Sequence, residues 1–89
     1  MRVPAYTGQF YKDIKRMQKR GKDMDALKSV VGMLIAGKAL GVAYRDHRLV
    51  GNYAGRRECH IQPDWLLVYK LQEETIVFER TGTHSDLFK

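Results

Sequence analysis

The chain has few of the features that mark secreted and membrane proteins. Its 89 residues include a single cysteine, Cys59, which has no partner for an internal disulfide. No apolar run approaches the roughly 18 residues of a membrane-spanning helix, and the N-terminus lacks the apolar core of a secretory signal peptide. We therefore expect a soluble cytoplasmic protein that folds as a single domain of residues 1–89.

Acidic residues are also scarce, and the shortage is confined to one end of the chain. The net charge of +6 lies entirely in residues 1–22, which hold seven basic residues and one acidic residue, whereas residues 23–89 hold nine of each. This asymmetry favours a polyanionic partner, either nucleic acid or an acidic protein, although a solvated helix face rich in lysine has the same composition. The candidate RNA contacts in this segment are Lys12, Lys15, Lys19 and Arg20.

The N-terminal half has the periodicity of two helices. Phe10, Ile14 and Met17 are spaced as the apolar stripe of a helix that begins after a cap at Thr7 and ends before Gly21. A second helix is expected between a cap at Asp23 and a stop at Gly37, with apolar residues at the same spacing: Met24, Leu27, Val30, Val31, Leu34 and Ile35. Residues 3–6, ahead of the first helix, are expected to form a short strand.

The C-terminal half has the composition of strands. Extended segments are expected at residues 42–45, 53–61, 65–71 and 75–81. The turns at residues 63–64 and 72–74 are short, and short turns between successive strands imply an antiparallel meander. The expected fold class is α+β, with two N-terminal helices packed on one face of a small antiparallel sheet.

Alternation in residues 53–61 separates the side chains into two rows. The row expected to face the helices is mostly apolar and consists of Tyr53, Cys59 and Ile61. The row expected to face outward is charged or titratable and consists of Arg56, Glu58 and His60. Chemistry is therefore expected on the face of the sheet away from the helices.

The three histidines of the chain, His47, His60 and His84, all lie in the sheet half, and Asp64 follows His60 by four residues. Imidazoles that titrate near neutrality, a carboxylate and nearby arginines supply the base, the acid and the cations that cleavage of RNA through its 2′-hydroxyl requires. Metal-assisted hydrolysis is a second option, but the chain has no two-histidine motif at helical spacing and no cysteine pair. The same residues could also be ordinary surface histidines and an ordinary turn aspartate without a catalytic role.

Three segments carry a resemblance to a known family: YRDHRL (residues 44–49), GNYAGRRECHIQPDWLLVYKL (51–71) and FERTGTHSDLF (78–88). They closely resemble the YafQ branch of the RelE-like toxins, and the helical half is similar in length and basic character. The resemblance implies the RelE-like toxin fold and a metal-independent endoribonuclease, without a cofactor, that cuts messenger RNA in the ribosomal A site. A degenerate homologue that only binds an antitoxin or the ribosome is the alternative.

The resemblance also implies the partners. They are a cognate antitoxin of the RelB/DinJ-like kind, which holds the toxin inactive, the ribosome through its ribosomal RNA, and messenger RNA. Operator DNA would be contacted only through the toxin–antitoxin complex, and no membrane is implied.

By motif, the family's site residues match His47, His60, Asp64, His84 and Phe88. The resemblance makes His84 the proton donor, leaves His60 and Asp64 as competing candidates for the base, and gives His47 the part of orienting or stabilising the phosphate. Phe88 would hold the tail or stack on a base.

Two arginines, Arg56 and Arg80, complete the expected phosphate contacts. The last strand would bring Arg80 to the site and Gly82 would let the chain turn there, but Arg80 shares its parity with Ile76 and Phe78, which indicates a side chain directed toward the helices. Trp65 also matches the family motif, although a large aromatic residue at the start of a strand is at least as typical of a core.

Overall fold

The computed structural model describes residues 1–88, which fold around a five-stranded sheet with the strand order β1-β5-β4-β3-β2. Its strands are β1 (Val3–Tyr6), β2 (His47–Arg48), β3 (Arg57–Gln62), β4 (Trp65–Leu71) and β5 (Thr75–Gly82). The last four form the predicted antiparallel meander, whereas β1 pairs in parallel with β5 at the edge. The α+β class is confirmed, and the sheet is mixed because the helices carry the chain from β1 to the meander.

Both predicted helices form, as α1 (Gly8–Lys19) and α2 (Met24–Ile35). The Thr7 hydroxyl accepts a hydrogen bond from the Phe10 amide, and the Asp23 carboxylate accepts from the amides of Asp25 and Ala26, so both predicted N-caps are confirmed. Gly37 has a φ of +75°, the left-handed conformation that ends a helix and that glycine adopts without strain.

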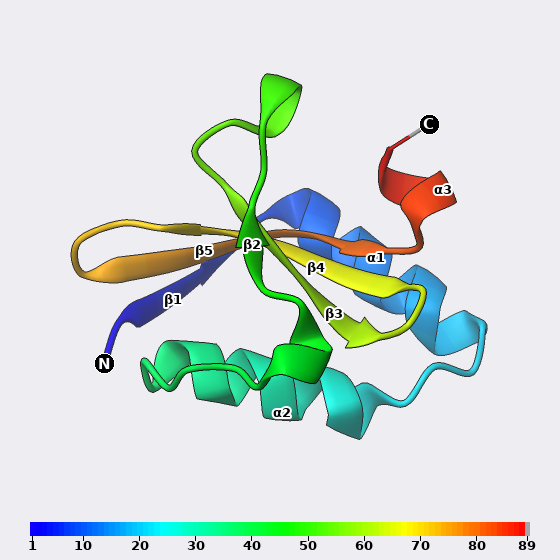
Figure 1. Ribbon diagram of the computed structural model, residues 1–89. Helices are drawn as coiled ribbons and strands as arrows, with labels where there is room; N and C mark the ends of the chain where they lie inside the picture. The colour runs from blue at the N-terminus through cyan, green and yellow to red at the C-terminus, as the bar shows by residue number, and fades with distance from the viewer. Residues whose placement is uncertain (89) are drawn as a thin grey trace.

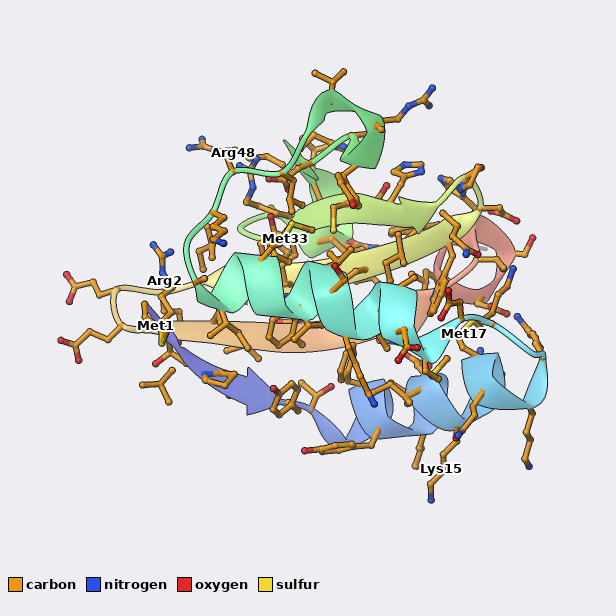
Figure 2. All side chains as sticks on the ribbon, turned by 90° about the horizontal axis from the view of Figure 1, so that it is seen from below. Met1, Arg2, Lys15, Met17, Met33 and Arg48 are labelled. Carbon is orange, nitrogen blue, oxygen red and sulfur yellow. The ribbon has the colours of Figure 1, made fainter. Side chains whose placement is uncertain are left out.

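The main core lies between the helices and one face of the sheet. Its buried residues are Phe10, Met17, Leu27, Val30, Leu34, Cys59, Ile61, Trp65, Leu67, Tyr69, Ile76 and Phe78. Figure 2 shows Lys15 extending from α1 away from this core, on the opposite side of the helix. Burial raises the pKa of the Cys59 thiol to about 12, so this cysteine is a protonated packing residue at neutral pH.

The opposite face of the sheet carries a second, smaller apolar cluster. Leu66 and Val68 of β4 are fully buried there by α3 (His84–Leu87) and by the loop after β2, which contribute Leu87, Leu49, Tyr53 and Phe88. In Figure 1, α2 lies below the sheet, whereas α3 and this loop lie above it. The short helix α3 was not predicted from the sequence.

Two predicted strands differ from the structure. Residues 42–45 are not extended but form a 3-10 turn, η1 (Val42–Tyr44), because the Tyr44 ring packs against the main core and turns the chain there. The strand predicted at residues 53–61 begins only at Arg57, since Gly51–Tyr53 form a second turn, η2. Tyr53 therefore does not face the helices but packs on the opposite face, while Cys59 and Ile61 face the helices as predicted.

The parity of β5 is broken by a β-bulge. Tyr69 pairs with Phe78 but the preceding Val68 pairs with Arg80, so Glu79 is an extra residue. Arg80 consequently has the register of Val68, on the face opposite the main core. Its guanidinium does bind helix α1, through Asp13, but it does so around the edge of the sheet. No helix in residues 1–88 is long and apolar enough to cross a membrane.

Candidate active site

The register of the sheet brings three distant segments together on the face away from the main core. One row across the strands consists of Glu58, Val68 and Arg80, and the next consists of His60, Leu66 and Gly82. His84 follows Gly82 by two residues and is the first residue of α3. The meander therefore places the predicted site residues of β3 and of the C-terminal segment on one surface.

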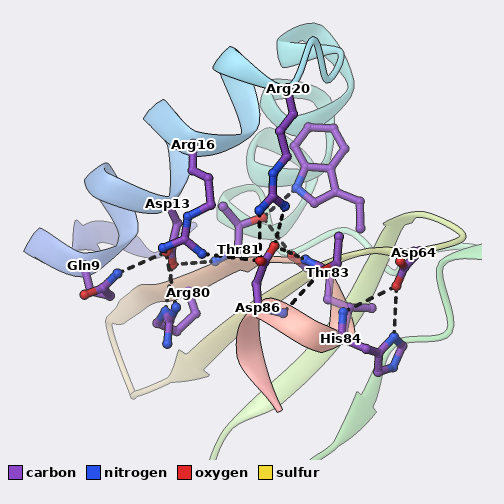
Figure 3. Close-up of polar contacts among 12 residues, drawn as sticks. Gln9, Asp13, Arg16, Arg20, Asp64, Arg80, Thr81, Thr83, His84 and Asp86 are labelled. Atoms are coloured by element: carbon purple, nitrogen blue, oxygen red, sulfur yellow. Dashed lines mark hydrogen bonds and ion pairs between the residues drawn. The ribbon is translucent and has the colours of Figure 1, made fainter. Parts of the chain in front are cut away.

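His84 is bound to Asp64 from the β3–β4 turn. Its Nδ1 lies 3.2 Å from Asp64 Oδ1, and its backbone amide donates to the same oxygen at 3.4 Å (Figure 3). These bonds lower the pKa of Asp64, so this group is a carboxylate at neutral pH and can only accept. The proton of the pair consequently sits on His84 Nδ1, and Nε2 is the nitrogen that can exchange a proton with a substrate.

His60 lies beside His84, with ring centroids 5.9 Å apart. Its Nδ1 is 3.2 Å from the carbonyl oxygen of Pro63, which can only accept, so Nδ1 carries a proton. Its Nε2 is 3.6 Å from Glu58 Oε1. The side chain of His60 is only 12% exposed, against 57% for His84, so the two rings present different surfaces to a substrate.

His47 reaches this group from the neighbouring strand β2. Its Nδ1 is 2.6 Å from the carbonyl oxygen of Arg45, and its Nε2 is 3.7 Å from the same Glu58 oxygen that His60 approaches. Glu58 is 4% exposed and lies between the two histidines. The sequence predicted Glu58 only as an outward-facing residue. Its position two residues before His60 on the same strand places both side chains on one face, and this spacing could have identified Glu58 as part of the site.

Phe88 closes the group on the side of α3. Its ring contacts the Tyr53 ring edge-on, with centroids 5.3 Å apart, and lies 6.2 Å from the His84 ring. Tyr53 also donates a long hydrogen bond of 3.5 Å to the carbonyl oxygen of Leu87. Phe88 and Tyr53 therefore hold the C-terminal segment against the sheet beside His84.

The expected phosphate-binding arginines are each paired with a carboxylate. Arg80 is held by Asp13, Arg56 by Glu79, and Arg20 by Asp86. Lys12, Lys15 and Lys19 are exposed on α1 instead, and the structure does not place them among the histidines. The predicted set thus divides into arginines that pair with a carboxylate of the same chain and lysines that are exposed to solvent.

The model of the family described as "Bacterial toxin of type II toxin-antitoxin system, YafQ" matches residues 2–89. The chain belongs to this toxin family. It is 49% identical over 84 residues to the mRNA interferase toxin YafQ of Escherichia coli (strain K12), a match that covers 93% of this chain and 91% of the relative.

Solved structures of the YafQ family have the same fold. The crystal structure of YafQ from Escherichia coli strain BL21(DE3) is 46% identical and superposes with a TM-score of 0.96 over the full length of both chains. YafQ in the crystal structure of the Escherichia coli DinJ–YafQ complex is 47% identical, with a TM-score of 0.94 over the full length of both chains.

Trp65, which matches the YafQ motif, lies outside the histidine group. Its ring is fully buried in the main core, and its Nε1 donates a 2.9 Å hydrogen bond to the Thr81 hydroxyl, which in turn donates to the Leu66 carbonyl at 2.7 Å. Trp65 therefore packs against β5 on the main-core side of the sheet, and its buried side chain cannot reach RNA.

Gly82 was predicted to let the chain turn after β5, but the structure gives this glycine a different role. It is not among the described glycines with a positive φ, so the turn itself does not require glycine. A Cβ at this position would lie 3.0 Å from both Cβ and Oδ2 of Asp86. A side chain at position 82 would therefore crowd Asp86, because α3 folds back tightly onto the end of β5.

Proposed function

We propose that this protein is the toxin of a type II toxin–antitoxin system and acts as an endoribonuclease that cleaves messenger RNA in the ribosomal A site without a metal ion. The observation that carries the proposal is the pair of imidazoles His60 and His84, 5.9 Å apart, with Asp64 bound to His84. Membership of the YafQ family and the mRNA interferase named among its members support it. Among residues 1–88, no three side chains of His, Cys, Asp or Glu are grouped as metal ligands.

The reaction is attack of the ribose 2′-oxygen on the adjacent phosphorus. A base takes the proton of the 2′-hydroxyl, an acid gives a proton to the departing 5′-oxygen, and the products are a 2′,3′-cyclic phosphate and a 5′-hydroxyl end. The attacking and leaving oxygens are in line through phosphorus, so the base and the acid must lie on opposite sides of it. Two rings 5.9 Å apart have the separation to flank one phosphate.

In this proposal His84 is the acid. Asp64 accepts from its Nδ1, which orients the ring and stabilises the imidazolium, while Nε2 carries the proton for the leaving oxygen. The base is then His60, because Asp64 has a lowered pKa and is occupied by His84. The Pro63 carbonyl keeps a proton on His60 Nδ1, so Nε2, which lies 3.6 Å from Glu58 Oε1, is the nitrogen that takes the 2′-hydroxyl proton in this role.

The remaining residues have supporting parts. Arg80 and Arg56 stabilise the charge that develops on the phosphate, and His47 orients the phosphate. Glu58 orients His60, and Phe88 anchors the tail. The exposed lysines of α1 bind ribosomal RNA. We further propose an antitoxin of the DinJ-like kind as partner, since YafQ of Escherichia coli is seen in complex with DinJ, and a cytoplasmic location, where the ribosome is found.

Cleavage on programmed ribosomes tests the proposal. The wild type, stripped of bound metal with excess chelator and then transferred to programmed ribosomes, should cut A-site messenger RNA and leave 2′,3′-cyclic phosphate ends. His84→Gln should slow single-turnover cleavage by roughly 10²–10⁴-fold with unchanged ribosome affinity. Products with 3′-hydroxyl ends, or a chelator-treated toxin that cuts only after a transition metal is added back, would indicate metal-assisted hydrolysis. Ribosome and antitoxin binding without any cleavage would indicate a degenerate toxin that is only a binding module.

A further inference from the structure

Asp13 is a fully buried carboxylate in the middle of α1. Both of its oxygens are saturated: Oδ2 accepts from Arg80 Nε at 2.7 Å and from the Thr81 amide at 3.1 Å, and Oδ1 accepts from Arg80 Nη2 at 3.2 Å and from Gln9 Nε2 at 3.1 Å. Figure 3 shows this group on the side of Asp86 remote from His84. Four hydrogen bonds on one carboxylate fix its orientation and that of the Arg80 guanidinium.

The position of Asp13 follows from the edge of the sheet. β1 pairs with β5 only as far as Phe78, and beyond that residue α1 runs along the open edge. Asp13 therefore accepts the Thr81 amide hydrogen that a longer β1 would have accepted. The same carboxylate accepts two parallel hydrogen bonds from the neighbouring Arg80. This bidentate geometry fixes the orientation of an arginine more firmly than a single hydrogen bond does.

Stability of the fold does not by itself explain why the chain keeps the ion pair of Asp13 and Arg80. Replacing such a pair by apolar residues of similar volume is often neutral or stabilising, because the cost of desolvating two charges is removed. What the pair does provide is a single orientation of Arg80. The bulge at Glu79 places Arg80 in the row of Val68, one row and about 7 Å along the strand from the row of His60 and Gly82.

We propose that Asp13 is a positioning residue for the proposed RNA cleavage: it holds Arg80 so that the remaining donors of the guanidinium meet the negative charge that develops on the scissile phosphate. Arg80 donates to Asp13 through Nε and Nη2, and its guanidinium also lies beside the Tyr53 hydroxyl. Its side chain is 23% exposed, so Nη1 can meet a phosphate oxygen on the open side. A cation oriented before the reaction stabilises a transition state without reorganisation, whereas a mobile arginine must first be ordered. The inference rests on the proposed function.

The first arm of the test needs no substrate. Nitrogen-15 NMR of the Arg80 side chain in the free protein should show slow exchange of the Nε hydrogen and slow rotation of the guanidinium, and both should become fast in Asp13→Asn. Phe10→Leu is the matched control, because it disturbs the core side of the same helix and should leave the Arg80 signals restrained. If Asp13→Asn does not fold, Asp13→Glu keeps the charge and displaces the carboxylate by one methylene. A mobile Arg80 in the wild type would overturn the inference.

The second arm is a double-mutant cycle in single-turnover cleavage on programmed ribosomes. Arg80→Gln should lower the rate by roughly 10²–10³-fold, as loss of one transition-state donor does, and Asp13→Asn by roughly 10–10²-fold with ribosome affinity unchanged. The double variant should be no slower than Arg80→Gln alone, since Asp13 acts only through Arg80. Rates that multiply, or a folded Asp13→Asn protein that cuts like the wild type, would overturn the positioning role. If the wild type itself does not cut, the proposed function fails, and the NMR arm still reports whether Asp13 restrains Arg80.

Discussion

The guanidinium of Arg20 donates two hydrogen bonds, of 2.7 and 3.1 Å, to the carboxylate of Asp86, and thereby joins the end of α1 to α3. Arg16 lies 3.5 Å from the same carboxylate. Asp86 also accepts from the Thr83 amide at 2.9 Å, which completes the capping box that starts α3 at His84. An arginine expected from the sequence to bind RNA therefore forms an intramolecular ion pair at the surface, beside the proposed acid.

We predict that Asp86→Asn and Arg20→Gln both loosen α3. The amides of Leu87 and Phe88, which donate to Thr83 and His84 within this helix, should exchange with deuterium faster in either variant. Lys19→Gln is the matched control, because it removes an exposed charge from the same end of α1 and should leave the protection unchanged. If Arg20 served mainly as an RNA ligand, Asp86→Asn would leave α3 protected and would strengthen ribosome binding by adding a positive charge.

The same pair predicts part of the acid stability. The hydrogen bond from Arg20 holds the pKa of Asp86 well below its usual range. A folded-state pKa below the unfolded value of about 3.9 means that the contribution is complete above that pH and is lost as the pH falls toward the folded-state value. The free energy of unfolding of Asp86→Asn should therefore fall less steeply than that of the wild type below about pH 4. Parallel curves for the two proteins in urea titrations across this range would contradict the assignment.

Much of the fold was predictable because it rests on local signals. The caps at Thr7 and Asp23, the apolar stripes of both helices and the short turns of the meander all act within a few residues of each other. The helix α3 could also have been predicted, since Thr83 and Asp86 have the spacing of a capping box. His60, Asp64 and His84 were singled out from the sequence itself, and the family resemblance gave them their roles. The structure brings these three residues together.

The rest depends on contacts between distant positions. The carboxylates that hold Arg20, Arg56 and Arg80 lie 66, 23 and 67 positions away in the sequence, so no local pattern reveals them. The bulge at Glu79, which sets the direction of Arg80, is a property of the pairing of β5 with β4. Asp13 looked like one more charged residue of a basic helix, and only the open edge of β5 explains why it is buried.

We predict that the lysines of α1, and not Arg20, carry the electrostatic contact with ribosomal RNA. Replacing Lys12, Lys15 and Lys19 by glutamine should weaken ribosome association and lower its salt dependence, with the slope of log K against log salt falling by roughly 0.7–0.9 for each phosphate that is no longer neutralised. The melting temperature should hardly change, because all three side chains are exposed. Lys28→Gln on α2 removes one charge at an exposed position and is the control for each single lysine substitution on α1. Equal slopes for the triple variant and the wild type would refute the contact.

The bond between Asp64 and His84 separates an orienting carboxylate from a general base. If Asp64 only orients His84, then Asp64→Asn should slow single-turnover cleavage by roughly 10–100-fold, the range found when a metal-binding histidine loses its carboxylate partner. The amide can still accept from Nδ1 but cannot stabilise the imidazolium. His60→Gln should be slower still, by roughly 10²–10⁴-fold, because it removes the proposed base. The measurement compares the single-turnover cleavage rates of the two variants on the same programmed ribosomes, at toxin concentrations that saturate the ribosome. The slower variant identifies the base.

The pH dependence sharpens that comparison. The lowered pKa of Asp64 keeps it ionised above about pH 4, so it cannot produce a fall in rate between pH 7 and pH 5. Any such fall must come from protonation of another base; it should persist in Asp64→Asn and disappear in His60→Gln. Should His60→Gln retain most of the rate while Asp64→Asn loses at least a thousandfold, the base is Asp64, and its contact with His84 in the free protein must break before RNA can enter.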